Sequence, residues 1–210
     1  KDRYIEMPDG RKLPATLNNA VLEMVEHTQR GGTIKMAMYA LSEKSMQETL
    51  LTTAFERGIK VKLLLDGVAE WTQPIRQELL AKIKAAKGQA PAAMNRMFQV
   101  KVIYPQAFID RGRTRNLNTG ETIYGTMHEK FGIFYQPDCK IPFDCFAGSS
   151  NISYGSDQVF AENRFVFKNE SSVARQYAEE FARLWNEYGS DELGNAESEP
   201  YISAEPVPGG

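Results

Sequence analysis

Apolar positions recur with two different spacings along the first third of the chain. Residues 15–30 place them at helical spacing and stop at a pair of glycines, whereas residues 33–41 form a short apolar run typical of a buried strand. A helix over 42–57, with Ser42 as its cap, and a strand over 59–66 follow. A strand, a helix and a strand at this spacing predict a parallel βαβ unit.

The same two spacings continue to residue 188. They predict helices over 73–87 and 171–188, strands over 98–104, 123–135, 145–150 and 162–167, and a basic loop over 105–121. The predicted fold is therefore of the α/β class, an α+β sandwich with a mixed, largely parallel central β-sheet flanked by helices.

The chain changes composition at Gly189. From there it carries five acids, three prolines and four glycines, with no lysine or arginine. Such a composition is typical of a loosely ordered segment. We expect residues 1–190 to form one domain and residues 191–210 an acidic tail or linker.

Composition excludes little else. Hydrophobic residues make up 42% and charged residues 25% of 210 residues, and no apolar run approaches the roughly 20 residues of a membrane span, so no transmembrane segment is expected. The net charge of -2 does not point to nucleic acid, but residues 82–115 hold eight basic residues and one acid. This stretch fits either a polyanion-binding surface or a solvated helix face followed by a loop. Its last part contributes Arg111, Arg113 and Arg115 as candidate substrate contacts.

The two cysteines, Cys139 and Cys145, bracket a loop that contains proline between two predicted strands. A disulfide there is slightly favoured over two free thiols if the compartment is oxidising. The compartment itself is not determined, with a periplasmic or secreted location slightly favoured over the cytoplasm. Two cysteines without a nearby histidine do not form a zinc site.

Chemistry-bearing residues concentrate in GTMHEKFGIFY (125–135) and FAGSSNIS (146–153). Alternation along a strand puts His128 and Lys130 on one face, and it does the same for Ser149 and Asn151. Lysine, hydroxyl and amide donors suit an anion with several oxygens, and an imidazole can attack phosphorus or transfer a proton. Each piece alone also fits a core histidine, a solvated lysine or an ordinary turn, but their joint occurrence does not. The second histidine, His27, ends a predicted helix and has no such surroundings.

The run HEK at 128–130, then GSSN at 148–151, then EN at 162–163, resembles the HKD motif of the phospholipase D superfamily. The opening strand, helix and strand and the final helix also resemble that superfamily, so the likeness extends over residues 15–188. The interval between Asn151 and Glu162 resembles that of single-motif bacterial endonucleases.

The resemblance implies a phosphodiesterase that works through a phosphohistidine and needs no metal or other cofactor. His128 would be the nucleophile in one subunit and the general acid and base in the other. Lys130 and Asn151 would hold phosphate oxygens, Ser149 would add a hydrogen bond and Glu162 would orient His128. Further substrate contacts would come from Gly148, Ser150 and Asn163. Because the chain has one motif, a homodimer with a shared site is expected, the alternative being one half of a longer two-motif enzyme.

One position departs from the motif. An aspartate is expected five residues after the lysine, where this chain has Tyr135, and Asp138 and Asp144 are candidates to replace it. Nucleic acid is the preferred substrate, because of the single motif and the basic stretch. A phospholipid is the alternative, with Trp71 or Phe108-Ile109 as lipid contacts, although a buried-core role is favoured for these. A non-catalytic binding domain is the third reading.

Overall fold

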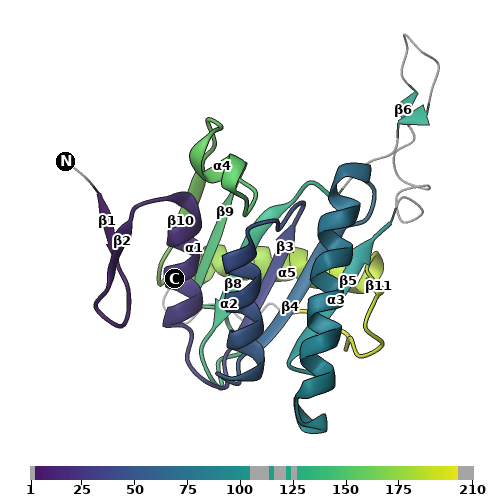
Figure 1. Ribbon diagram of the computed structural model, residues 1–210, viewed down its shortest axis with the longest axis horizontal. Helices are drawn as coiled ribbons and strands as arrows, with labels where there is room; N and C mark the ends of the chain where they lie inside the picture. Colours follow the sequence, from purple (N-terminus) through teal and green to yellow (C-terminus); the bar gives the residue numbers. More distant parts are fainter. Residues whose placement is uncertain (1–2, 105–113, 116–121, 124–126, 203–210) are drawn as a thin grey trace.

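The computed structural model describes residues 3–104, 114–115, 122–123 and 127–202 (Figure 1). Its helices are α1 (Leu17–His27), α2 (Lys44–Phe55), α3 (Gln73–Gln89), α4 (Tyr154–Gln158) and α5 (Ser171–Glu187), with 3-10 turns η1 (Glu70–Thr72) and η2 (Ala92–Met94). Its strands are β1 (Tyr4–Glu6), β2 (Lys12–Pro14), β3 (Thr33–Met38), β4 (Lys60–Asp66), β5 (Phe98–Ile103), β6 (Thr114–Arg115), β7 (Thr122–Ile123), β8 (Lys130–Tyr135), β9 (Asp144–Gly148), β10 (Arg164–Phe167) and β11 (Ser190–Asp191).

A seven-stranded mixed sheet forms the centre, in the order β10-β9-β8-β3-β4-β5-β11. The predicted α/β class, with helices on both faces of a mixed sheet, is confirmed. Parallel pairing is confined to β3, β4 and β5, so the sheet is less parallel than expected. The reason is that β8 runs antiparallel to both β3 and β9, while β10 and β11 add antiparallel edges.

Helices α1, α2 and α3 cover one face of the sheet and α5 crosses the other (Figure 1). Side chains alternate between these two cores as strand geometry requires. On β8, Phe134 joins the core under α1 to α3, whereas Phe131 and Ile133 pack with Phe181 and Trp185 toward α5. Because helices cover both faces at the centre of the sheet, its central strands are continuous apolar runs in the sequence.

Several predicted boundaries need correction. The strand predicted over 123–135 begins only at Lys130, so His128 lies in the irregular segment just before β8. The start of that prediction belongs instead to β7, which pairs with β6. Helix α2 begins at Lys44, with Glu43 rather than Ser42 as its N-terminal cap. The β1–β2 hairpin, α4 and β11 were not predicted, and all three consist of short segments.

The segment after Gly189 packs against the domain as far as residue 202. Strand β11 pairs with β5, and the carboxylate of Glu199, only 4% exposed, forms ion pairs with Lys35 (2.5 Å) and Lys62. These two lysines lie opposite each other on β3 and β4, so burial of both requires a counter-charge. The expectation of loose order is therefore wrong for residues 190–202, and residues 203–210 lie outside the described part. The division of the chain at residue 190 stays a prediction.

Cys139 and Cys145 are both free thiols, so the expected disulfide is not formed. Cys145 sits opposite Ile133 inside β9 and points into the core beneath α5, whereas Cys139 is exposed in the turn after β8. The two side chains therefore lie in different environments. Burial raises the pKa of the Cys145 thiol to about 12.

None of the helices in the described ranges combines the length and the apolar character that crossing a bilayer demands.

Candidate active site

The candidate residues meet where the parallel strands β3 and β4 reach their carboxyl ends, which is called here the edge of the sheet that carries the site. The last residue of β3, Met38, pairs with Lys130 at the start of β8, and β4 ends beside them at Asp66. The carboxyl ends of the parallel strands thus open at the edge where α4 lies (Figure 1). In open α/β sheets this edge is where ligands bind.

His128 is exposed at this edge, immediately before β8. Its ring lies edge-on to the ring of Tyr39, with the centroids 4.7 Å apart. The backbone beside it is fixed, since the N–H of Tyr39 donates to the carbonyl of Glu129 at 2.9 Å. The imidazole is therefore supported on one side and open to solvent on the other.

Lys130 is buried, with 5% of its surface exposed, although it carries a charge. Its Nζ donates to the carbonyl of His128 at 2.8 Å and lies 5.0 Å from the centre of the Tyr39 ring. Burial lowers the pKa of this amine, and the carboxylates of Glu162, Glu129 and Asp66 oppose that shift. A partly desolvated cation of this kind interacts strongly with an anionic substrate.

Ser149, Glu162 and Asn163 form a local network between the loop after β9 and the residues before β10. The Ser149 hydroxyl donates to the Glu162 carboxylate and accepts from the backbone N–H of Asn163 at 3.1 Å. Among the residues described, no hydrogen bond joins Glu162 to His128. The carboxylate that was expected to orient the histidine instead holds Ser149 and acts electrostatically on Lys130.

Asn151 connects this loop to β3. Its Oδ1 accepts from the backbone N–H of Ala40 at 3.2 Å, which leaves the Nδ2 group as a donor. Because Tyr39 contacts His128 and Ala40 binds Asn151, the two residues that follow β3 bring the two halves of the motif together. The structure therefore places His128, Lys130, Ser149, Asn151 and Glu162 around one edge of the sheet.

Gly148 and Ser150 have structural roles that differ from the expected substrate contacts. A Cβ atom at Gly148 would lie 2.3 Å from the carbonyl oxygen of Asn163, so the backbone of Gly148 packs closely against the residue just before β10. Ser150 is 1% exposed, and its hydroxyl donates to the carbonyl of Asn151. Both residues shape the loop that carries Asn151.

Arg164 was not among the predicted residues, although it fixes this loop. Its guanidinium donates to the carbonyls of Leu17, Ser150 and Asn151, and it lies over the ring of Phe146. Burial lowers the pKa of Arg164 to about 10. No spacing in the sequence reveals that this arginine turns inward, because its partner on α1 is 147 residues away.

Asp66 is the second residue that was missed. Its Oδ1 accepts the backbone N–H of Met127 at 3.1 Å, and its Oδ2 accepts that of Ala69 at 2.8 Å. A single carboxylate thus ties the residue before His128 to the turn after β4. The available signal was an aspartate at the end of an apolar strand and just before a glycine.

The basic stretch does not form one surface where it is described. Lys82 pairs with Glu78 at 3.1 Å, and Lys101 donates to the carbonyl of Trp185 at 2.8 Å. Arg96 pairs with Glu197, a residue of the acidic segment. For this part of the stretch, these contacts favour a solvated helix face followed by a loop over a polyanion-binding surface. Of the three arginine candidates, Arg111 and Arg113 lie outside the described residues, and Arg115 is described only as backbone of β6.

Neither of the two aspartates considered as replacements for the motif aspartate lies near His128. Tyr135 lies at the far end of β8, where burial raises the pKa of its phenol and its hydroxyl accepts from Lys35 at 3.4 Å. Asp144 starts β9 at that same far end and accepts the backbone N–H of Asn169 at 2.7 Å. Asp138 lies in the turn between these strands, and His27 ends α1 at the same edge, near Phe143.

Trp71 is 53% exposed, so the buried-core role expected for it is wrong. It lies in η1, immediately after β4, and its ring meets that of Tyr39 edge-on. The other two residues considered as lipid contacts, Phe108 and Ile109, lie outside the described residues.

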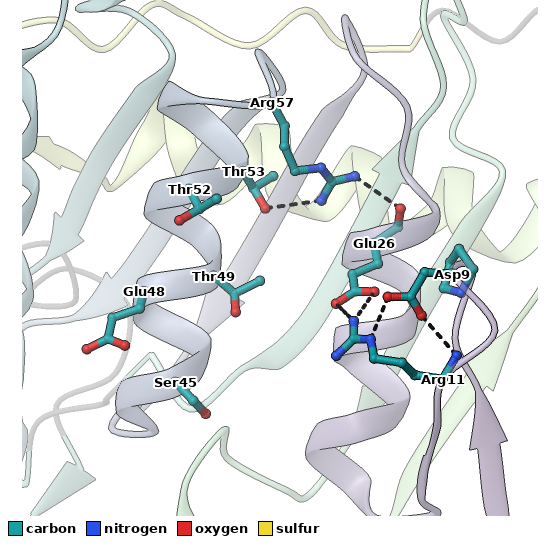
Figure 2. Close-up of a pocket in the computed structure, with 10 residues that line it drawn as sticks. Asp9, Arg11, Glu26, Ser45, Glu48, Thr49, Thr52, Thr53 and Arg57 are labelled. Atoms are coloured by element: carbon teal, nitrogen blue, oxygen red, sulfur yellow. Dashed lines mark hydrogen bonds and ion pairs between the residues drawn. The ribbon is translucent and has the colours of Figure 1, made fainter.

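A separate open hollow of about 680 Å³ lies between the β1–β2 hairpin, α1 and α2 (Figure 2). Hydroxyl groups of α2 line it, together with two arginines that are already paired. Arg11 binds Asp9 and Glu26, and Arg57 donates to Thr53 and to backbone carbonyls. None of the motif residues lines this hollow.

Within the described ranges, no three His, Cys, Asp or Glu side chains cluster as a metal centre would require.

Comparison with protein families assigns this arrangement to a class. Residues 21–185 match the family model described as "Cardiolipin synthase, PLD-like domain". The chain therefore belongs to that phospholipase D-like family, and its fold is that of a phospholipase D-like domain. A search among curated proteins finds no match.

Two solved structures share the fold over nearly their whole length. A phospholipase D family member, Nuc from Salmonella typhimurium, has a TM-score of 0.58 and 17% identity, covering 91% of this chain and 97% of that one. NucT from Helicobacter pylori has a TM-score of 0.55 and 14% identity, covering 90% and 98%. At these identities the likeness establishes the fold alone.

Proposed function

We propose that this protein is a metal-independent phosphodiesterase that cleaves nucleic acid through a phosphohistidine intermediate. The observation that carries the proposal is the convergence of Lys130, Ser149, Asn151 and Glu162 beside an exposed histidine, His128. The cation and the amide donor suit the non-bridging oxygens of a phosphodiester. The open imidazole suits in-line attack on its phosphorus.

The reaction would take place in two displacements. An imidazole nitrogen of His128 forms a P–N bond while the P–O bond to one sugar breaks, and the leaving oxygen takes a proton from a second imidazole. That second imidazole then removes a proton from water, which attacks phosphorus and releases His128. Lys130 and Asn151 stabilise the charge that develops on the phosphate oxygens in both steps.

The second imidazole has to come from another chain segment. His27, the only other histidine, ends α1 beside Phe143, at the edge opposite His128. We therefore propose a homodimer in which two His128 side chains meet across a two-fold axis.

The proposal is tested by hydrolysis of bis(p-nitrophenyl) phosphate in EDTA, with the molar mass read by light scattering. Turnover by a dimer that is lost in His128→Ala and retained in His27→Ala is expected. Persistent turnover in His128→Ala would contradict the mechanism, and a metal requirement would contradict metal independence. Mixing the wild type with His128→Ala and allowing subunits to exchange tests the shared site. Activity should then fall with the square of the wild-type fraction, whereas independent sites would give a linear fall.

A phospholipid substrate is the second candidate, favoured by one feature of the surface. Large apolar side chains are exposed on both sides of Glu162 in the chain, namely Tyr154, Val159, Phe160 and Phe165. The description of the matching family also names cardiolipin synthase. Cosedimentation with anionic vesicles, together with release of headgroup from them, would favour this candidate, and its absence would leave nucleic acid.

A further inference from the structure

Trp71 presents an aromatic ring beside the candidate active site. It is 53% exposed, whereas the other tryptophan of the chain, Trp185, is fully buried. Its position in η1, directly after β4, places it at the same sheet edge as His128. A large aromatic side chain loses apolar burial when it remains half exposed, so its placement calls for a reason.

The ring is held in place by a continuous series of contacts. The Nε1–H of Trp71 donates to the hydroxyl of Tyr39 at 3.1 Å, and the two rings meet edge-on with centroids 5.4 Å apart. The ring of Tyr39 in turn contacts His128. On the other side, Asp66 accepts the backbone N–H groups of Val68 and Ala69 just before η1. Trp71 is therefore held in place, and only the ring of Tyr39 separates it from the imidazole. Because its side chain is already ordered, a ligand can stack on it with little loss of side-chain entropy.

We propose that Trp71, held by Tyr39, is a stacking subsite for the nucleobase next to the scissile phosphodiester, and that the protein prefers single-stranded nucleic acid. This inference rests on the proposed function, whose phosphate site at Lys130 and Asn151 it extends. An aromatic ring stacks on any base, because every base has a π-face. Bases in a duplex are covered on both faces by their neighbours, so only an unpaired base can use the subsite.

The surroundings of Trp71 favour a base over a lipid surface. Its exposed neighbours in the chain, Glu70 and Gln73, are polar, and one of them is acidic. Membrane-binding surfaces gather several apolar side chains with basic residues around them. A single fixed ring among polar groups instead suits a planar aromatic ligand.

The first test compares two oligonucleotides of equal length in EDTA, one with bases and one abasic around the cleaved position. The kcat/KM for the oligonucleotide with bases, divided by that for the abasic one, should decrease by a factor of about 5 to 100 in Trp71→Ala. Trp71→Phe, which retains an aromatic ring, should keep most of this ratio. Tyr4→Ala serves as the control, because Tyr4 is similarly exposed (58%) on the distant β1–β2 hairpin.

An unchanged ratio in Trp71→Ala would overturn the subsite, even while turnover that depends on His128 upheld the phosphodiesterase. No turnover of either oligonucleotide would count against the proposed function. In that case the subsite is tested by binding. The measurement is the change in tryptophan fluorescence of His128→Ala when an oligonucleotide is added. A single-stranded oligonucleotide should quench the emission, its duplex should quench less, and the quench should vanish in Trp71→Phe. Emission that responds to anionic phospholipid vesicles but not to the oligonucleotide would assign Trp71 to a membrane instead.

Discussion

The carboxylate of Asp66 accepts the backbone N–H of Met127 at 3.1 Å, one residue before the histidine of the motif. The same carboxylate binds the backbone N–H groups of Val68 and Ala69. It therefore sets the position of His128 and of the turn leading to Trp71 together. A buried acceptor shared by three donors cannot be replaced by an amide, because the NH₂ group would face an N–H.

We expect Asp66→Asn to lower kcat by about 10- to 100-fold through misplacement of His128. It should also lower the free energy of unfolding by about 1–3 kcal/mol. Steady-state kinetics on a single-stranded oligonucleotide and urea unfolding measure the two effects. Asp9→Asn is the matched control, because Asp9 also accepts a backbone N–H but does so on the exposed hairpin. Wild-type kinetics in Asp66→Asn would show that Met127 needs no such anchor.

Glu162→Gln should shift the alkaline limb of the pH–rate profile to lower pH. The amine of Lys130 is charged only below its pKa, which burial lowers and the negative charge of Glu162 raises. Removing that charge moves the pKa of Lys130 further down, so the cation that we propose to hold the phosphate is lost at a lower pH. The glutamine still offers an oxygen to Ser149, which keeps the hydrogen bond.

Glu48→Gln is the control for this shift, since Glu48 lines the remote hollow between α1 and α2. If the alkaline limb moves equally in both variants, the titration of Lys130 does not cause it.

Glu199→Gln should lower the free energy of unfolding by about 3–5 kcal/mol, because it leaves Lys35 and Lys62 buried without a counter-charge. Glu197→Gln provides a control two residues away. Its partners, Arg96 and Lys60, are at the surface, so its loss should cost about 0–1 kcal/mol. Urea midpoints measured at one pH compare the two. An equally small loss of unfolding free energy in both variants would indicate that Lys35 and Lys62 find other partners.

Thiol labelling of the native protein should modify Cys139 and spare Cys145. The first is exposed, whereas the second is buried with its pKa raised to about 12, so little thiolate forms. In denaturant without reductant, two thiols should react. Finding none there would mean that the two residues can form a disulfide after all.

The sequence predicted the parts of the fold that local pattern controls. The strands around Ile34, Leu63 and Val100 were predicted because both faces of the sheet are covered, which makes those segments continuously apolar. The start of β8 was misjudged, since the apolar character upstream of Lys130 continues past the point where pairing with β3 stops.

The grouping of the candidate residues was predicted as far as motif spacing reaches and no further. His128, Lys130, Ser149, Asn151 and Glu162 were recognised from short intervals and lie together. Three residues that hold them, or that hold the sheet beneath them, were not recognised. Asp66 binds Met127 across 61 residues, Arg164 binds Leu17 across 147, and Glu199 binds Lys35 across 164. A side chain whose partner lies that far along the chain leaves no periodic signal.

The ion pair between Lys35 and Glu199 also sets an order of events during synthesis. The sheet acquires its two inward-facing lysines early, but the carboxylate that neutralises them is 164 residues further along from Lys35. At ribosomal speed that interval is roughly 10 to 30 s. In that interval β3 and β4 can pair with both lysines in solvent, but packing α5 over them would bury two like charges side by side. Glu199 is thus made long after the strands whose charges it neutralises, and we expect α5 to pack fully over β3 and β4 only once it is available.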